Sequence, residues 1–111
     1  MASYISKKMT SPTQLGTSAS TVYTVGAGVT ATVKEILVAN VSGSSSSVSI
    51  HFVNSGGIAS SSNLLFPAVG ISANSSLAFD VNQVLDAGST IQAFAGNASA
   101  INIMISGFEA S

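Results

Sequence analysis

The chain of 111 residues contains no cysteine, no arginine and no tryptophan, and charged side chains of either sign are few. Without cysteine it can form no disulfide, no thiolate metal site and no thiol nucleophile. Three lysines against four acids give a net charge of −1, which argues against nucleic-acid binding, because phosphate contacts need clustered cations. No apolar run reaches the roughly 18 residues of a membrane span, so we expect no membrane partner.

Hydroxyl side chains take the place of the missing charges. Charged residues make up 6% of the chain, against about 25% in ordinary soluble domains. Serine and threonine account for 22 and 8 residues. The chain is nevertheless 46% hydrophobic with a mean hydropathy of +0.53, so it can bury a core and is not disordered. Its length indicates one domain.

Short apolar segments with period-two alternation predict an all-β fold. Apolar side chains alternate with polar or small ones over Val48–Phe52, Leu77–Val81 and Ile101–Ile105, and more weakly over Ser20–Val25 and Thr90–Ala95. Such alternation places one face of each strand against a core. Gly, Ser, Asn and Asp separate the segments as turn residues. Seven or eight short strands predict a single-domain antiparallel β-sandwich or jelly roll.

Two segments deviate from simple alternation. Residues 29–41 have apolar side chains in both phases, so either the strand is covered on both faces or a bulge near Lys34 and Glu35 switches its phase. A helix is the competing interpretation, but β-branched residues disfavour it. Pro67 cannot donate to a ladder, which predicts that residues 64–71 form an edge strand or a loop.

No catalytic constellation is visible. Gly26–Ala31 matches a dinucleotide-binding pattern, but it leads into a predicted strand where that motif needs a helix, so we interpret it as a hairpin loop. His51 is the only imidazole, and its alternation with Ile50 and Phe52 predicts a solvent or interface face. The acids lack the spacing of a metal loop or a catalytic pair; they are Glu35, Asp80, Asp86 and Glu109. We therefore expect no enzyme activity, no metal and no cofactor.

A β-rich surface with so little charge predicts self-association. Natural edge strands are blunted with lysine or other charges, and this chain has almost none to use. Coverage by neighbouring copies is the simplest alternative, so we expect a cyclic homo-oligomer, with a trimer as the preferred number. The apolar residues predicted on second strand faces, available for such contacts, are Tyr23, Val25, Ile36, Val38, Phe94 and Met104.

The first residues form a candidate contact segment. We divide the chain into an N-terminal arm, residues 1–14, and a β-sandwich domain, residues 15–111. Two of the three lysines lie in this arm, so it could dock on a neighbouring subunit; a solvated tail or a first edge strand is the alternative. The predicted partner contacts are Tyr4, Ile5, Lys7 and Lys8.

One further pattern carries a family resemblance. The pattern is carried by Leu15–Thr17, Thr21–Val25, Thr30–Ile36 with Asn40, and Val84–Ala93 followed by Ile103–Glu109. In these stretches the chain resembles small virion proteins of tailed bacteriophages. The similarity covers nearly the whole chain as a pattern of strands and turns. It implies a β-sandwich structural component of the particle, on the head or near the tail, and carries over no catalytic residue.

The resemblance leads to a functional hypothesis and two alternatives. We expect a capsid decoration or cement protein, made in the host cytoplasm, that contacts the major capsid protein or another virion protein. The first alternative is a tail or neck module whose hydroxyl and amide side chains bind host glycans, although aromatic stacking platforms are scarce. The residues for such binding lie in Ser44–Ser47, Asn54–Gly57, Ser60–Asn63 and at Asn97. The second alternative is ice or mineral adhesion through Thr30 and Thr32.

Overall fold

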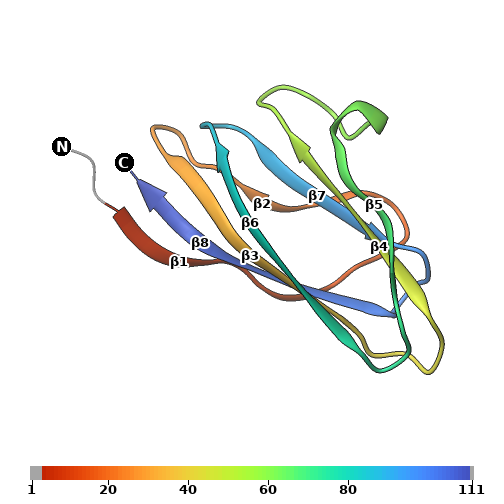
Figure 1. Cartoon of the computed structure of the whole chain (residues 1–111). Helices are drawn as coiled ribbons and strands as arrows, with labels where there is room; N and C mark the ends of the chain where they lie inside the picture. Colours follow the sequence, from red (N-terminus) through yellow and green to blue (C-terminus); the bar gives the residue numbers. More distant parts are fainter. Residues whose placement is uncertain (1–3, 111) are drawn as a thin grey trace.

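The computed structural model is a sandwich of two antiparallel sheets with four strands each (Figure 1). It describes residues 4–110, and for residues 4–8, 10 and 11 the backbone alone. The strands are β1 (Tyr4–Gln14), β2 (Ser20–Thr24), β3 (Thr30–Asn40), β4 (Ser46–Val53), β5 (Leu64–Ile71), β6 (Ser76–Leu85), β7 (Thr90–Ala95) and β8 (Ile101–Ala110), with a short 3₁₀-helix η1 (Ser61–Asn63) before β5.

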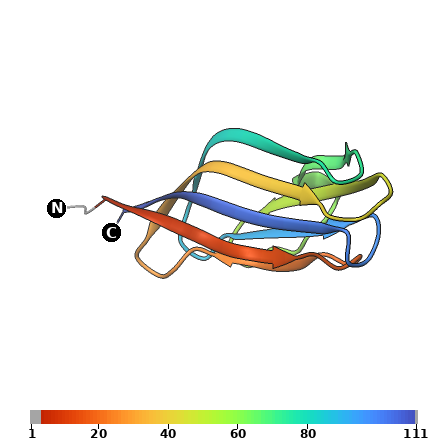
Figure 2. The ribbon, with the colours of Figure 1, turned by 90° about the horizontal axis from the view of Figure 1, so that it is seen from below.

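The strand order identifies the sandwich as a jelly roll. The first sheet has the order β1-β8-β3-β6 and the second β2-β7-β4-β5. Figure 2 shows the first sheet in front of the second, with β1 and β6 at its two edges. Eight antiparallel strands wound into two sheets in this way are the double Greek key of the jelly roll. The predicted all-β sandwich or jelly roll is therefore confirmed.

The core lies between the sheets and is mainly aliphatic. Its largest fully buried members include Val33, Ile36, Val38, Ile103 and Ile105 from the first sheet and Val48, Ile50 and Ile91 from the second. At the side closed by the edge strands β5 and β6, Phe66 contacts Phe79 with ring centroids 4.8 Å apart. Burial of each large apolar side chain stabilises the fold by roughly 1.5–3 kcal/mol.

A β-bulge at Lys34 explains the two phases of β3. The register of β3 with both β6 and β8 shifts between Val33 and Glu35. One extra residue moves the following side chains to the opposite face, so Val33 faces the core before the bulge and Ile36 and Val38 face it afterwards. The bulge interpretation is confirmed and the helix is wrong. The prediction that Ile36 and Val38 lie on an outer face is also wrong, because the bulge turns them inward.

Two further outer-face predictions fail for a related reason. Tyr23 and Val25, assigned to a second face, are 7% and 1% exposed and belong to the core cluster. In β2 the register with β7 shifts between Thr21 and Tyr23, so the side chains before and after this shift do not follow one alternation between the two faces of the sheet.

Strand β5 is an edge strand, as Pro67 predicts, and it is also irregular. Its register with β4 shifts between Val48 and Ile50, opposite the proline. Ala68 has a positive φ of 45°, and its backbone N–H donates to the Ser49 hydroxyl at 2.9 Å instead of to a ladder carbonyl. The side chain of Ser49 thus satisfies a donor that the bulge would otherwise leave without a partner.

Candidate interaction surface

The charged residues are distributed unequally between the two sheets. None of the residues in strands β2, β7, β4 and β5 is Lys, Arg, Asp or Glu. Asp86 lies in the turn between β6 and β7. The other charged residues all lie in strands of the first sheet: Lys7 and Lys8 in β1, Lys34 and Glu35 in β3, Asp80 in β6 and Glu109 in β8. The second sheet therefore presents an uncharged face.

His51 lies on the outer face of this uncharged sheet, but it is not open to solvent. Alternation along β4 places it opposite Ile50 and Phe52, as predicted, yet the residue is only 5% exposed. The connection between β4 and β5 folds back over it, and its ring lies 6.0 Å from that of Phe94. The predicted exposure of His51 is wrong because alternation identifies a face and does not show what covers that face.

A hydrogen-bond network around His51 holds the loop of residues 54–63 in place. His51 Nδ1 lies 2.8 Å from Asn63 Oδ1 and 3.1 Å from the Ser60 carbonyl oxygen. Two acceptors at one nitrogen assign the hydrogen to Nδ1. The Ser60 N–H also donates to Asn63 Oδ1 at 3.0 Å, and Asn63 Nδ2 donates to the Ile58 carbonyl at 2.8 Å. The side chain of Ile58, whose carbonyl is held in this way, is 78% exposed.

The outer face of the first sheet contains a shallow apolar hollow of about 150 Å³. Leu37 and Met104 are paired across β3 and β8, as are Ala39 and Asn102. Beside them the register of β1 with β8 shifts between Thr10 and Thr13, where Pro12 cannot donate to the ladder. The residues that line the hollow are Pro12, Leu37, Ala39, Asn102, Ile103 and Met104.

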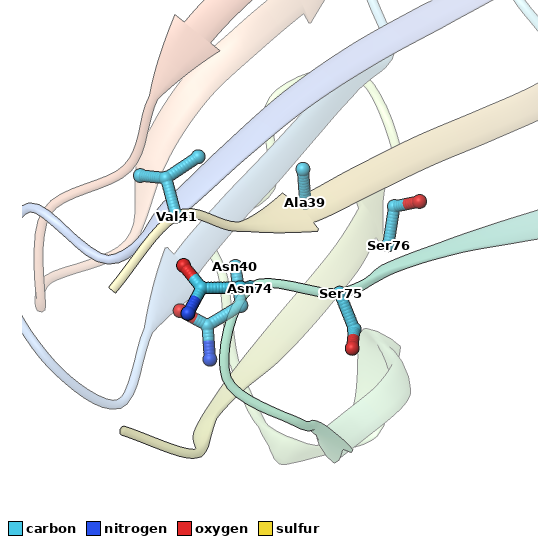
Figure 3. A pocket seen from close by; sticks show the side chains of 6 residues that line it. All are labelled: Ala39, Asn40, Val41, Asn74, Ser75 and Ser76. Carbon is cyan, nitrogen blue, oxygen red and sulfur yellow. The ribbon is translucent and has the colours of Figure 1, made fainter. Parts of the chain in front are cut away.

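A second hollow, of about 330 Å³, lies at the end of the sandwich beside Asn40 (Figure 3). Asn40 is 1% exposed. Its Nδ2 donates to the carbonyls of Ser44 and Ile71 at 2.8 and 3.0 Å, and its Oδ1 accepts from the N–H and the hydroxyl of Ser42. This amide fastens the β3–β4 loop to the end of β5. Asn40 therefore serves the fold, and Asn74, Ser75 and Ser76 are the polar residues left to line the hollow.

Tyr23 and Glu109 link the two sheets near the chain ends. The Tyr23 hydroxyl donates to the Glu109 carboxylate across the sandwich, from β2 to β8. Burial raises the pKa of Tyr23 above its ordinary value, and this hydrogen bond and the negative charge of Glu109 raise it further. The pair is a structural contact between sheets, and the phenol stays protonated well into the alkaline range.

The predicted partner-contact residues lie in strand β1. The backbones of Tyr4, Ile5, Lys7 and Lys8 pair with Ala110, Glu109, Gly107 and Ser106 of β8. Their side chains lie outside the described part of the structure, so their role in contacts stays a prediction. The segment assigned to an arm forms an edge strand, the alternative considered from the sequence, over residues 4–14.

The other candidate groups do not converge. Glu35 and Asp80 face each other as a cross-strand pair in β3 and β6, and Lys34, which neighbours Glu35, donates to Asn82. Within the described residues, no three His, Cys, Asp or Glu side chains form a group that could hold a metal ion. Nor does any helix among them have the length and apolar character to cross a membrane.

The Gly26–Ala31 pattern leads into β3, as expected, but the turn joins the two sheets and is not a hairpin.

Sequence reasoning did not single out Ile58 or Leu37 as surface residues. Ile58 had a recognisable signal, because it is the one large apolar residue in the Gly-, Ser- and Asn-rich stretch 54–63. The sequence around Leu37 carries no such signal, because alternation without the bulge assigns Leu37 to the same inner face as Val33.

The jelly roll is similar to solved structures of assembly-forming proteins. A scan against protein-family models and a search of curated proteins find no match. A chain from Bacillus endospore appendages, described as disulfide-linked pili, superposes with a TM-score of 0.60 at 15% identity over 98% of this chain and 88% of that one. A chain of infectious bursal disease virus (Gx strain) superposes with a TM-score of 0.50 at 13% identity, over 98% of this chain and 32% of that one. At these identities the likeness concerns the fold.

Proposed function

We propose that this protein is a non-enzymatic structural subunit that associates with copies of itself. The observation that carries the proposal is the uncharged second sheet, which has two edges, β2 and β5, and no ionic side chain in its strands. Edges and faces of this kind are stable in solution when another surface covers them. The jelly-roll neighbours in a pilus and in a virus support an assembly role.

Within this class we favour the virion decoration or cement protein that the phage resemblance implies. Subunits would bridge neighbouring capsid proteins and bury uncharged, hydroxyl-rich surface, which strengthens a shell without any reaction. A trimer with β1 turned toward the shell would present Tyr4, Ile5, Lys7 and Lys8 to the capsid. Repeated weak contacts from symmetric copies add up through multivalency.

A filament subunit is the second candidate, favoured by the superposition on the pilus chain, of which 88% is covered. The pilus is described as disulfide-linked, whereas this chain has no cysteine. A filament of this protein would therefore be held by non-covalent contacts alone.

Mass measurement and electron microscopy of the purified protein test the proposal. We expect species larger than the 11.0 kDa chain in light scattering after size-exclusion chromatography at micromolar concentration. Closed oligomers that bind to undecorated phage heads in hundreds of copies support the cement role, and extended polymers in negative stain support the filament. A lone monomer at these concentrations contradicts both.

A further inference from the structure

The loop of residues 54–63 presents one apolar side chain on a fixed support. Its carbonyl at Ile58 is held by Asn63, and Asn63 is held by the buried His51. The Gly57 N–H donates to the Asn54 carbonyl at 2.9 Å, which closes a turn just before Ile58. A large apolar side chain on an ordered loop loses little conformational entropy on binding. At 78% exposure, Ile58 has the form of an anchor residue.

The apolar hollow on the other sheet has the size and chemistry to receive such an anchor. Its volume is about 150 Å³, and an apolar cavity of about this volume accepts a benzene molecule. The four-carbon side chain of isoleucine is smaller than that ligand. The only polar side chain that lines the hollow is the uncharged Asn102, and the loop around Ile58 carries no charge. Contact between them would therefore desolvate no ion.

The anchor and the hollow cannot meet within one molecule. Ile58 follows β4 of the second sheet, at the end that also holds the β6–β7 turn, where Ser55 lies against Gly88. The hollow lies on the first sheet, toward the opposite end, where Asn102 lies near the start of β8. Any contact between them joins two copies through different surfaces, and such heterologous contacts repeat from copy to copy into a ring or a filament.

We infer that Ile58 of one copy inserts into the hollow formed by Pro12, Leu37 and Met104 of the next copy. This inference rests on the proposed self-association and specifies its contact. The molecule measures 49 × 26 × 18 Å along its principal axes, so its broad faces exceed the roughly 800 Å² per partner of a stable interface. The occupant is thus a second copy of this chain, whose Ile58 loop lies against the hollow on the first sheet of its neighbour.

Paired cysteine variants test the contact, because the chain has no cysteine of its own. Ile58→Cys and Met104→Cys are purified separately, mixed and oxidised with copper-phenanthroline. We expect a disulfide-linked dimer in the mixture and none in either variant alone, since the contact joins unlike surfaces. Dimers of Ile58→Cys alone would indicate a symmetric contact and overturn the inference, as would a mixture that yields no dimer.

Association measurements separate this inference from the proposed function. We expect Ile58→Asp to weaken association about 30-fold or more, as truncation of a central anchor does, with an unchanged far-ultraviolet circular dichroism spectrum. Ala39→Phe, which fills the hollow, should act likewise. Val84→Ser is the matched control with unchanged association, because Val84 is exposed in β6, at the end of the first sheet away from the hollow. If both variants assemble like the unmodified chain, the contact is wrong while self-association stands. If the unmodified chain stays monomeric, both proposals fail.

Discussion

At the scale of single residues, Gly107 lies close against the backbone of the neighbouring strand β3. A Cβ built at this position would lie 2.1 Å from the Thr32 carbonyl oxygen and 3.1 Å from the Lys34 nitrogen. The two atoms belong to residues on either side of Val33, the register partner of Gly107 next to the bulge in β3. Only a residue without a side chain fits there.

Gly107→Ala should therefore destabilise the fold by about 2–3 kcal/mol through overpacking against rigid backbone. Urea denaturation followed by circular dichroism measures the change. Gly43→Ala is the matched control, because no atom lies within 4 Å of a Cβ built there, and its effect should stay within about 0.5 kcal/mol. Equal effects of the two substitutions would show that the bulge does not constrain Gly107.

Asn40 is the second residue with a measurable structural role. Asn40→Ala removes four hydrogen bonds and leaves the Ile71 carbonyl without its side-chain donor in a buried place. We expect a loss of about 3 kcal/mol in the free energy of unfolding. Asn82→Ala, which removes an exposed contact to Lys34, serves as the control and should cost about 0.5 kcal/mol or less. A loss at position 40 no larger than that of the control contradicts the assignment.

The raised pKa of Tyr23 predicts how the free energy of unfolding responds to alkaline pH. Above a pH of about 10 the unfolded tyrosine loses its proton while the folded one keeps it, because its pKa is raised. The native state then binds more protons than the unfolded state, so raising the pH favours unfolding by up to about 1.4 kcal/mol per pH unit for this group. We expect this added slope between pH 10 and 11.5 in the unmodified chain and its absence in Tyr23→Phe. Parallel slopes in the two proteins would contradict the raised pKa of Tyr23.

At the scale of elements, the sequence predicts the strands better than it predicts their surroundings. Alternation locates β4, β7 and β8, because each contributes one regular face to the core, and Pro67 correctly marks an edge strand. Bulges and loops limit the rest. The bulge in β3 was one of several open interpretations, and the outward side of Leu37 follows only once the bulge is known. Burial of His51 depends on how a ten-residue connection folds, which no local pattern encodes.

The loop of residues 54–63 should lose its order when the Asn63 side chain that holds it is removed. Asn63→Ala breaks the bonds to His51, Ser60 and Ile58, so we expect amide hydrogen exchange in this loop to accelerate about tenfold or more, while β3 and β8 stay protected. Ser61→Ala, an exposed change in the same 3₁₀-helix, is the control. Exchange that is unaltered in Asn63→Ala would show that the network does not hold the loop.

At the scale of the whole molecule, the separation of charge between the sheets is the feature that composition could not disclose. The scarcity of charge is visible in the sequence, but its placement depends on which strands share a sheet. The jelly-roll order assigns Lys7, Lys8, Lys34, Glu35, Asp80 and Glu109 to one sheet and none to the other. The scarcity of charge predicted self-association, and the topology identifies the uncharged face that a neighbouring copy would cover.

Sedimentation velocity at low and high salt tests most directly whether this uncharged sheet is covered by other copies. The Debye length falls from about 14 Å at 50 mM to about 4 Å at 500 mM salt, which weakens contacts between charges and leaves apolar contacts intact. We predict species heavier than the 11.0 kDa chain at both concentrations, with an association constant that changes less than about twofold. A single monomeric species at both concentrations, or an assembly that dissociates in 500 mM sodium chloride, would contradict the account.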